Sequence, residues 1–174
     1  MLITQLKNDE NLQNFIIDNC CENEVCIEID DEIDAEDYLV IKLDEYYQEN
    51  VKSPNTPKSP DCLIVQICED ERYKVFVVEL KNVKSQNNSH LSRSSIREKF
   101  ETCLLNFTSD RFRPYFYDER NQFQLHLILV AGKVDKEKMK TFEFDFLLTI
   151  RPLSFANKRY AIQGKNPNPL IRPC

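Results

Sequence analysis

The distribution of apolar residues along the chain predicts four β-strands. Two apolar runs, residues 61–68 and 73–81, are separated by the short acidic turn EDER, as in a hairpin. A third apolar run, residues 123–131, ends at a glycine. Residues 38–43 favour a fourth strand because adjacent Val and Ile side chains are common in strands, although a helix continuing to Glu49 fits the same residues.

Apolar residues spaced three or four positions apart predict two helices. Residues 9–19 place Leu12, Phe15 and Ile16 on one helical face, and Asp9 at the start favours the helix dipole. Residues 94–110 carry a longer apolar stripe. Its members and the predicted capping residues are Ile96, Phe100, Leu104 and Phe107, with Ser94 or Ser95 as the cap and Glu98 in a capping box.

The remaining segments carry weaker signals. The sequence VCIEI within the acidic residues 20–37 is a candidate short strand, and residues 52–60 predict a loop because they contain three prolines. Residues 135–150 begin helix-like and turn strand-like. The predicted order is helix, strand, strand, strand, helix, strand. It indicates an α/β single domain, residues 1–174, with a central mixed β-sheet flanked by helices.

The length and the apolar runs predict a soluble cytoplasmic protein. A chain of 174 residues suits one domain. No apolar run reaches the roughly 18 residues that a membrane span needs. The first 13 residues carry acids where a secretory signal would have its apolar core. We therefore expect an intracellular location and no membrane partner.

The seven cysteines are expected to be reduced thiols. Their number is odd, and disulfides are rare in cytoplasmic proteins. Cys62, Cys68 and Cys103 lie in apolar patterns and are expected to pack as small core residues. The three N-terminal cysteines lack the CxxC spacing of a zinc site, namely Cys20, Cys21 and Cys26.

Glycine and histidine are too rare for several catalytic motifs. Two glycines exclude a GxGxxG loop, a P-loop and a GxSxG elbow. Two distant histidines exclude an HExxH zinc site, and His126 fits a sheet-face or core position better than a Cys–His catalytic pair. Carboxylates and lysine remain for catalysis, which is the chemistry of a hard divalent cation.

Charge divides the chain unevenly. Residues 1–50 hold 15 acids and two lysines, whereas residues 151–174 hold five basic residues and no acid. The overall net charge of −6 argues mildly against a nucleic-acid partner. The basic remainder is nevertheless compatible with a local phosphate-binding face, and two solvated surfaces of opposite sign explain the pattern equally well.

Charged residues mark the ends of the two strongest strands. Pro60-Asp61 opens the first strand, and Glu79-Leu80-Lys81 closes the second. With the predicted order of elements, these residues resemble the PD-(D/E)XK superfamily, the restriction-endonuclease-like nucleases. The resemblance covers roughly residues 9–131 as architecture and implies the αβββαβ core of that fold, followed by a basic C-terminal extension, residues 151–174.

The resemblance implies a restriction- or repair-like endonuclease that hydrolyses phosphodiester bonds in DNA and depends on Mg²⁺, which Mn²⁺ can replace. Asp61 and Glu79 would ligate the metal, with the Leu80 carbonyl as a further ligand. Lys81 would position the attacking water or help to deprotonate it. Such a small nuclease would act as a homodimer or as a module of a larger complex.

Further residues are candidates by position only. Glu10 and Glu45 are candidates for an additional metal-binding acid. Four basic residues lie on or just before the helix that follows the motif, and they fit phosphate contacts and ordinary exposed helix charges equally well: Lys84, Arg93, Arg97 and Lys99.

The motif makes a geometric prediction about the hairpin. Side chains alternate across a strand, and directly opposed residues of an antiparallel pair point to the same side. If residue 68 paired with residue 73, Asp61 would point away from Glu79. The site therefore requires an odd-length turn or a bulge near residues 68–73, which would set Asp61 opposite Glu79 or Lys81.

Two alternatives remain open from the residues alone. The acidic first 50 residues could dock a basic partner, as a non-enzymatic interaction or inhibitor protein would, with Glu79 and Lys81 as a surface ion pair. Alternatively, the chain could be an inactive nuclease-fold module.

Overall fold

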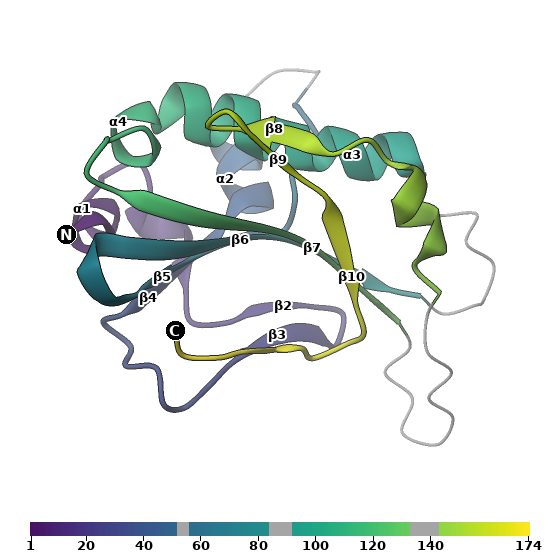
Figure 1. Cartoon of the computed structure of the whole chain (residues 1–174), viewed down its shortest axis with the longest axis horizontal. Coiled ribbons are helices and arrows are strands. Elements are labelled where there is room, and N and C mark those ends of the chain that lie inside the picture. The colour runs from purple at the N-terminus through teal and green to yellow at the C-terminus, as the bar shows by residue number, and fades with distance from the viewer. Residues whose placement is uncertain (52–55, 84–91, 133–142) are drawn as a thin grey trace.

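The computed structural model describes residues 1–51, 56–83, 92–132 and 143–174, which form one compact body. A six-stranded mixed sheet lies at its centre, in the strand order β1-β4-β5-β6-β7-β10. Figure 1 shows helices on one side of this sheet and the β2–β3 hairpin on the other. The strand bounds are β1 Ile16–Ile17, β4 Tyr38–Lys42, β5 Cys62–Ile67, β6 Arg72–Asn82, β7 Gln122–Gly132 and β10 Ile162–Lys165.

Antiparallel and parallel pairs are combined in the central sheet. Strands β1, β4, β5 and β6 pair antiparallel, whereas β7 runs parallel to both β6 and β10. The predicted mixed α/β class is therefore confirmed. Two smaller sheets complete the strands: β2 Cys20–Glu22, β3 Val25–Ile29 and β11 Leu170–Ile171 form one, and β8 Leu153–Phe155 and β9 Lys158–Tyr160 form the other.

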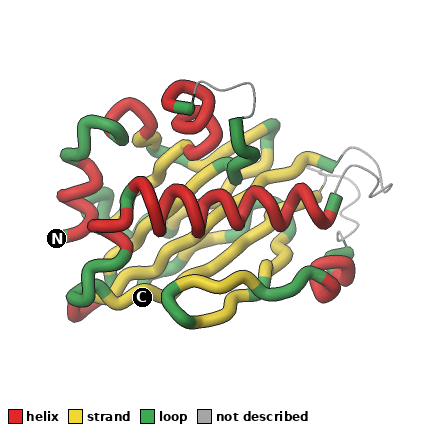
Figure 2. The backbone as a smooth tube through the Cα atoms, turned by 90° about the horizontal axis from the view of Figure 1, so that it is seen from above, coloured by secondary structure: helices red, strands yellow, loops and turns green. Residues whose placement is uncertain are grey.

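The helix after β6 covers one face of the sheet, which it crosses in Figure 2. It begins as α3, Arg93–Glu101, and continues as a π-helix, Thr102–Arg111. The predicted stripe, Ile96, Phe100, Leu104 and Phe107, is buried against the odd-numbered residues of β5, β6 and β7. The other helices are α1 Leu2–Lys7, α2 Leu43–Asn50 and α4 Arg113–Phe116, with 3-10 turns at Gln13–Phe15, Glu69–Glu71 and Asp145–Thr149.

The even-numbered residues of the central strands form a second core on the opposite face. Cys62, Ile64, Phe76 and Val78 pack there against the small sheet that contains β2, β3 and β11. Both faces of β5 and β6 are thus covered, which explains why their sequences are continuously apolar rather than alternating. The segments predicted at 25–29 and 38–43 are confirmed as strands, and α2 follows the second directly.

Three local predictions are wrong. Residues 9–19 form no α-helix and contain only the 3-10 turn Gln13–Phe15, because the Asp9 carboxylate accepts the Asn11 N–H at 2.9 Å in a turn, and Ile16 enters β1. Ser92 rather than Ser94 or Ser95 caps α3, and Glu98 pairs with Lys58. In the described part of residues 135–150, local hydrogen bonds form a 3-10 helix instead of a strand.

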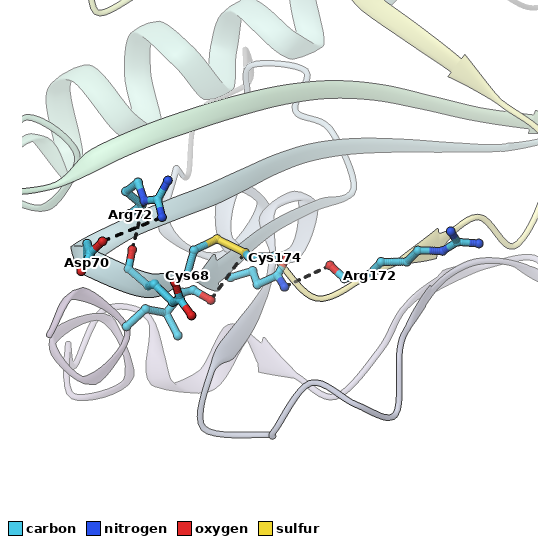
Figure 3. Close-up of a disulfide and its surroundings, with 8 residues drawn as sticks. Cys68, Asp70, Arg72, Arg172 and Cys174 are labelled. Atoms are coloured by element: carbon cyan, nitrogen blue, oxygen red, sulfur yellow. Dashed lines mark hydrogen bonds and ion pairs between the residues drawn. A yellow bond between two sulfur atoms is a disulfide. The ribbon is translucent and has the colours of Figure 1, made fainter.

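Three disulfides overturn the expectation of reduced thiols and with it the cytoplasmic location. They are Cys20–Cys62, Cys21–Cys26 and Cys68–Cys174. Disulfides persist in oxidising environments, so the structure indicates an extracellular or otherwise secreted setting. The expectation was wrong because it was based on the acidic N-terminus and on the odd number of cysteines. Disulfide pairing depends instead on which cysteines the fold brings together. Figure 3 shows Cys68–Cys174 linking the chain end to the turn after β5.

Cys103 has the predicted role of a small core residue. It is the free cysteine of the described residues, and it lies fully buried on the π-helix, where it packs in the core. Burial raises the pKa of its thiol, which makes the reactive thiolate unfavourable. Among the described residues, no helix is both long and apolar enough to cross a membrane.

Candidate functional site

The hairpin register brings Asp61 and Glu79 to the same end of the sheet. Strands β5 and β6 pair from Ile67↔Tyr73 to Cys62↔Val78, and the next step of this register sets Asp61 opposite Glu79. The connection, residues 68–72, has an odd length. Asp70 and Glu71 both adopt positive φ in it, which lets the chain reverse tightly. The geometric prediction made from the motif is confirmed.

Backbone hydrogen bonds hold Asp61 between two neighbouring segments. Its N–H donates to the Val78 carbonyl at 3.0 Å, and its carbonyl accepts the Leu43 N–H at 2.9 Å. Its carboxylate Oδ2 accepts the Leu80 N–H at 2.6 Å. The side chain is therefore fixed against the end of β6. The Leu80 backbone therefore contacts Asp61 through its N–H. The resemblance had instead implied a role for the Leu80 carbonyl, as a metal ligand.

Glu79 is a fully buried carboxylate with two lysine partners. Lys81 Nζ and Lys99 Nζ each lie 2.7 Å from the same oxygen, Glu79 Oε1. Lys81 comes from the same strand, and Lys99 from α3 above it. The Lys81 side chain is 35% exposed and the Lys99 side chain 20%, so Lys81 is the more accessible of the two ammonium groups.

Glu22 is a third acid at this site, and it was missed in the sequence. Its carboxyl group lies beside that of Asp61 and helps to raise the pKa of Asp61, as expected for two neighbouring acids. Glu22 ends β2, where Asn23 and Glu24 form a positive-φ turn. The nearby Cys20–Cys62 disulfide ties β2 to β5. Cysteine pairing is the signal that would have revealed Glu22, and the sequence does not show it.

Two carboxylate oxygens of this cluster lack a partner within the described ranges. They are Glu22 Oε2 and Glu79 Oε2, and both atoms are buried. Unpaired buried carboxylate oxygens are costly, so the cluster favours a positively charged group that would contact them. The three carboxyls also outnumber the two ammonium groups by one.

Burial dominates the electrostatics of the two central acids. It raises the pKa of Asp61 to about 6, to which Glu22 adds, while the Leu80 N–H and Lys99 act in the opposite direction. Burial and the charge of Asp61 raise the pKa of Glu79, although Lys81 and Lys99 oppose the change. Burial alone would lower the pKa of Lys81, but the surrounding carboxylates raise it, so Lys81 is an ammonium group at neutral pH.

We expect the protein to become more stable as the pH falls from about 7 to about 5. Asp61 has a raised folded-state pKa, so its contribution is complete below the unfolded value of 3.8 and is lost as the pH rises through about 6. The expected gain in unfolding free energy over this interval is about 1 kcal/mol. Urea denaturation at several pH values measures it.

Asp61→Asn is the matched control for this pH dependence. The variant keeps the shape and the acceptor for the Leu80 N–H but removes the titrating group, so the gain should largely disappear. Subtracting the two profiles cancels the groups that titrate elsewhere in both proteins. Identical profiles in the two proteins would show that Asp61 ionises as it does in the unfolded chain.

The outcome differs among the four predicted phosphate-binding residues. Lys84 lies outside the described residues. Arg93 is exposed at the start of α3. Arg97 donates to the Arg151 carbonyl at 2.6 Å and pairs with Glu101, which fixes it on the helix surface. Lys99 reaches inward to Glu79, so its contact is with the acidic cluster.

Glu10 and Glu45, the candidates for a further acid, are both exposed, whereas Glu22 lies beside Asp61. Within residues 1–51, 56–83, 92–132 and 143–174, no group of three or more His, Cys, Asp or Glu side chains is arranged to hold a metal ion. The Asp61–Glu79 pair is therefore the donor set to consider, with Glu22 beside it.

Comparison with known proteins does not assign a family or a function to this arrangement of residues. The chain matches no protein-family model, no curated protein and no solved structure.

Proposed function

We propose that this protein is a metal-dependent nuclease that hydrolyses phosphodiester bonds in DNA, with Asp61, Glu79 and Lys81 at its centre. The observation that carries the proposal is the convergence of these three side chains at the end of the β5–β6 hairpin. An acid pair beside a lysine, opened by Pro60 and built on a buried hairpin, is the arrangement that the PD-(D/E)XK resemblance implies.

The order of elements also supports this proposal. Strands β4, β5 and β6, helix α3 and strand β7 follow one another as in an αβββαβ core, and β7 lies parallel to β6. The chain departs from that scheme where α2 separates β4 from β5 and where the β2–β3 hairpin follows the first helix. The hairpin contributes Glu22, so this departure changes the composition of the site.

The residues present fit a small divalent cation. Carboxylate oxygens are the ligands that Mg²⁺ prefers, and one or two acids suffice because water completes its coordination. Asp61 and Glu79 would hold the ion, and Glu79 Oε2 has no hydrogen-bond partner among the described residues that would compete with it. When bound, Mg²⁺ or Mn²⁺ would activate a water molecule and neutralise charge on the phosphate.

The chain's own residues have distinct tasks in this scheme. Lys81 is protonated and partly exposed, so it can hold a phosphate oxygen or orient the attacking water, but it is a poor base in this state. Lys99 is more enclosed and neutralises Glu79. Arg93 is exposed on the adjoining helix end and remains our candidate for a phosphate contact with the DNA backbone.

The disulfides limit the biological setting of the proposal. They indicate an oxidising environment, so we do not extend the proposal to restriction or repair in the cytoplasm. A homodimer stays a prediction, and the acidic docking surface is the outcome to consider if metal binding fails.

Calorimetric titration of Mn²⁺ into the wild-type protein and into Asp61→Asn tests the proposal. We expect one Mn²⁺ site in the wild type, with an affinity at least about 100-fold weaker in the variant, because a ligand is replaced by a neutral amide. Metal-dependent cleavage of single- and double-stranded DNA should be lost in parallel.

Glu10→Gln is the matched control, since it removes an exposed acid that lies outside the cluster. This variant should bind Mn²⁺ and cleave DNA as the wild type does. Absence of Mn²⁺ binding in the wild type, or binding that Asp61→Asn leaves unchanged, would refute the metal site. Metal binding without cleavage of any nucleic acid would instead support an inactive nuclease-fold module.

A further inference from the structure

A second pocket lies on the opposite face of the sheet from Glu79. Its volume is about 380 Å³, and it is bounded by β3, β6, β7, β10 and the C-terminal segment. The sheet contributes Phe76, His126 and Ile128, which belong to the even-numbered face. Glu79 and Lys81 are odd-numbered residues of β6 and point to the helical face. The pocket is therefore separate from the candidate nuclease site.

Three cations line this pocket. They come from three different segments: Lys74 from β6, Lys165 from β10 and Arg172 from the C-terminal segment. None of the described residues that line the pocket is acidic. The side chains of these three residues also form no ion pair with any described acid, unlike Lys81, Lys99 and Arg97 elsewhere. Like charges brought together without an acid indicate a site for an anion.

His126 lines the pocket, and its side chain carries a polar atom without a partner. Its ring stacks on Phe76, with centroids 4.9 Å apart and an interplanar angle of 18°. Its Nε2 is buried and has no hydrogen-bond partner among the residues described. Burial lowers the pKa of this imidazole, and Lys74 and Lys165 lower it further. The imidazole is thus a titratable group beside the three cations, and an anion bound among them would favour its protonated form.

The wall that carries Arg172 is held in place at several points. Gln66 Nε2 donates to the Arg172 carbonyl at 3.2 Å, and the Cys68–Cys174 disulfide anchors the residues beyond it (Figure 3). Just before it, β11 pairs with β3, and the Asp30 N–H donates to the Ile171 carbonyl. The backbone at the pocket wall is therefore preorganised, which lowers the entropic cost of binding.

We infer that this pocket binds the phosphate group of a small phosphomonoester, held by Lys74, Lys165 and Arg172 beside His126. A phosphate dianion matches the excess of positive charge and offers several acceptor oxygens. Ligand pockets usually measure about 300–1,000 Å³, so this volume accommodates the phosphate and a compact organic group. The apolar wall formed by Phe76, Ile128 and Leu170 would contact that group.

Titration of the two histidines by NMR tests this site in the intact wild-type protein. The chain contains only His90 and His126, so the imidazole C–H signals are easily assigned by substitution of His90. Saturating inorganic phosphate, at an ionic strength held constant with NaCl, should raise the pKa of His126 by about one unit, because the dianion stabilises the imidazolium.

Matched lysine variants test whether phosphate binds in this pocket. Lys165→Gln and Lys74→Gln should each weaken phosphate binding several-fold, whereas Lys158→Gln, an exposed cation on β9 outside the pocket, should leave it unchanged. No shift of His126, or equal effects of all three variants, would overturn the proposal. Circular dichroism checks that each variant is folded.

The nature of the ligand is decided by three further probes. Ribose 5-phosphate should bind at least as tightly as inorganic phosphate, and ribose should not bind. Failure of ribose 5-phosphate to bind would overturn the assignment of a phosphomonoester as the ligand. Tighter binding of a 5′-phosphorylated DNA oligonucleotide would overturn the small-molecule assignment and identify a site for nucleic-acid ends. Neither outcome depends on the Mn²⁺ result at Asp61, so the two proposals can fail separately.

Discussion

Replacing both Cys68 and Cys174 with alanine should lower the free energy of unfolding by about 5 kcal/mol. This disulfide joins residues separated by 106 positions, the longest loop that any of the three closes. In the chain-entropy model, a longer loop removes more freedom from the unfolded chain. The link also holds the C-terminal segment against the turn after β5. Urea denaturation of the oxidised wild type and the double variant measures the change.

The other two disulfides are internal controls for this prediction. Their sequence separations are 42 for Cys20–Cys62 and 5 for Cys21–Cys26, which correspond to about 4 and about 2 kcal/mol in the same model. The three alanine pairs should therefore rank by loop length. Equal losses, or the smallest loss for Cys68–Cys174, would show that native-state contacts rather than unfolded-chain entropy set the effect.

Lys81→Met should lower kcat/KM for DNA cleavage by about 100- to 10,000-fold. The proposed task of Lys81 is to hold charge or water at the reacting phosphate, and a positioned polar group of this kind typically contributes that much. Mn²⁺ affinity should be retained or improved, since removal of an ammonium group leaves the carboxylates more negative. Steady-state cleavage and calorimetry on the same preparations separate the two effects.

Lys99→Met is the matched control, because both lysines contact the same oxygen of Glu79 at 2.7 Å. Lys99 projects from α3 and is the less exposed of the two, so its loss should affect stability more than cleavage. Equal losses of cleavage in the two variants would mean that both lysines serve only to neutralise Glu79. Lys81→Arg should retain part of the activity if a fixed positive charge suffices.

The sequence by itself determined the central hairpin and its covering helix. Continuous apolar runs appear where strands are buried on both faces, and β5 and β6 are such strands. The stripe from Ile96 to Phe107 likewise required one buried helical face. Strand alternation also set a condition on the hairpin: if Asp61 and Glu79 share a side, the connection has an odd length or a bulge, and the structure has the odd-length connection.

Only the tertiary structure decided the third acid, the lysine pair and the cysteine pairing. Glu22 and Lys99 reach the site from β2 and α3, and no local pattern reports contacts over such sequence distances. The disulfides depend on which cysteines the folded chain brings within bonding distance, for which the odd cysteine number gave the wrong indication. Local periodicity encodes burial, whereas the assembly of charges and thiols depends on how separate segments pack.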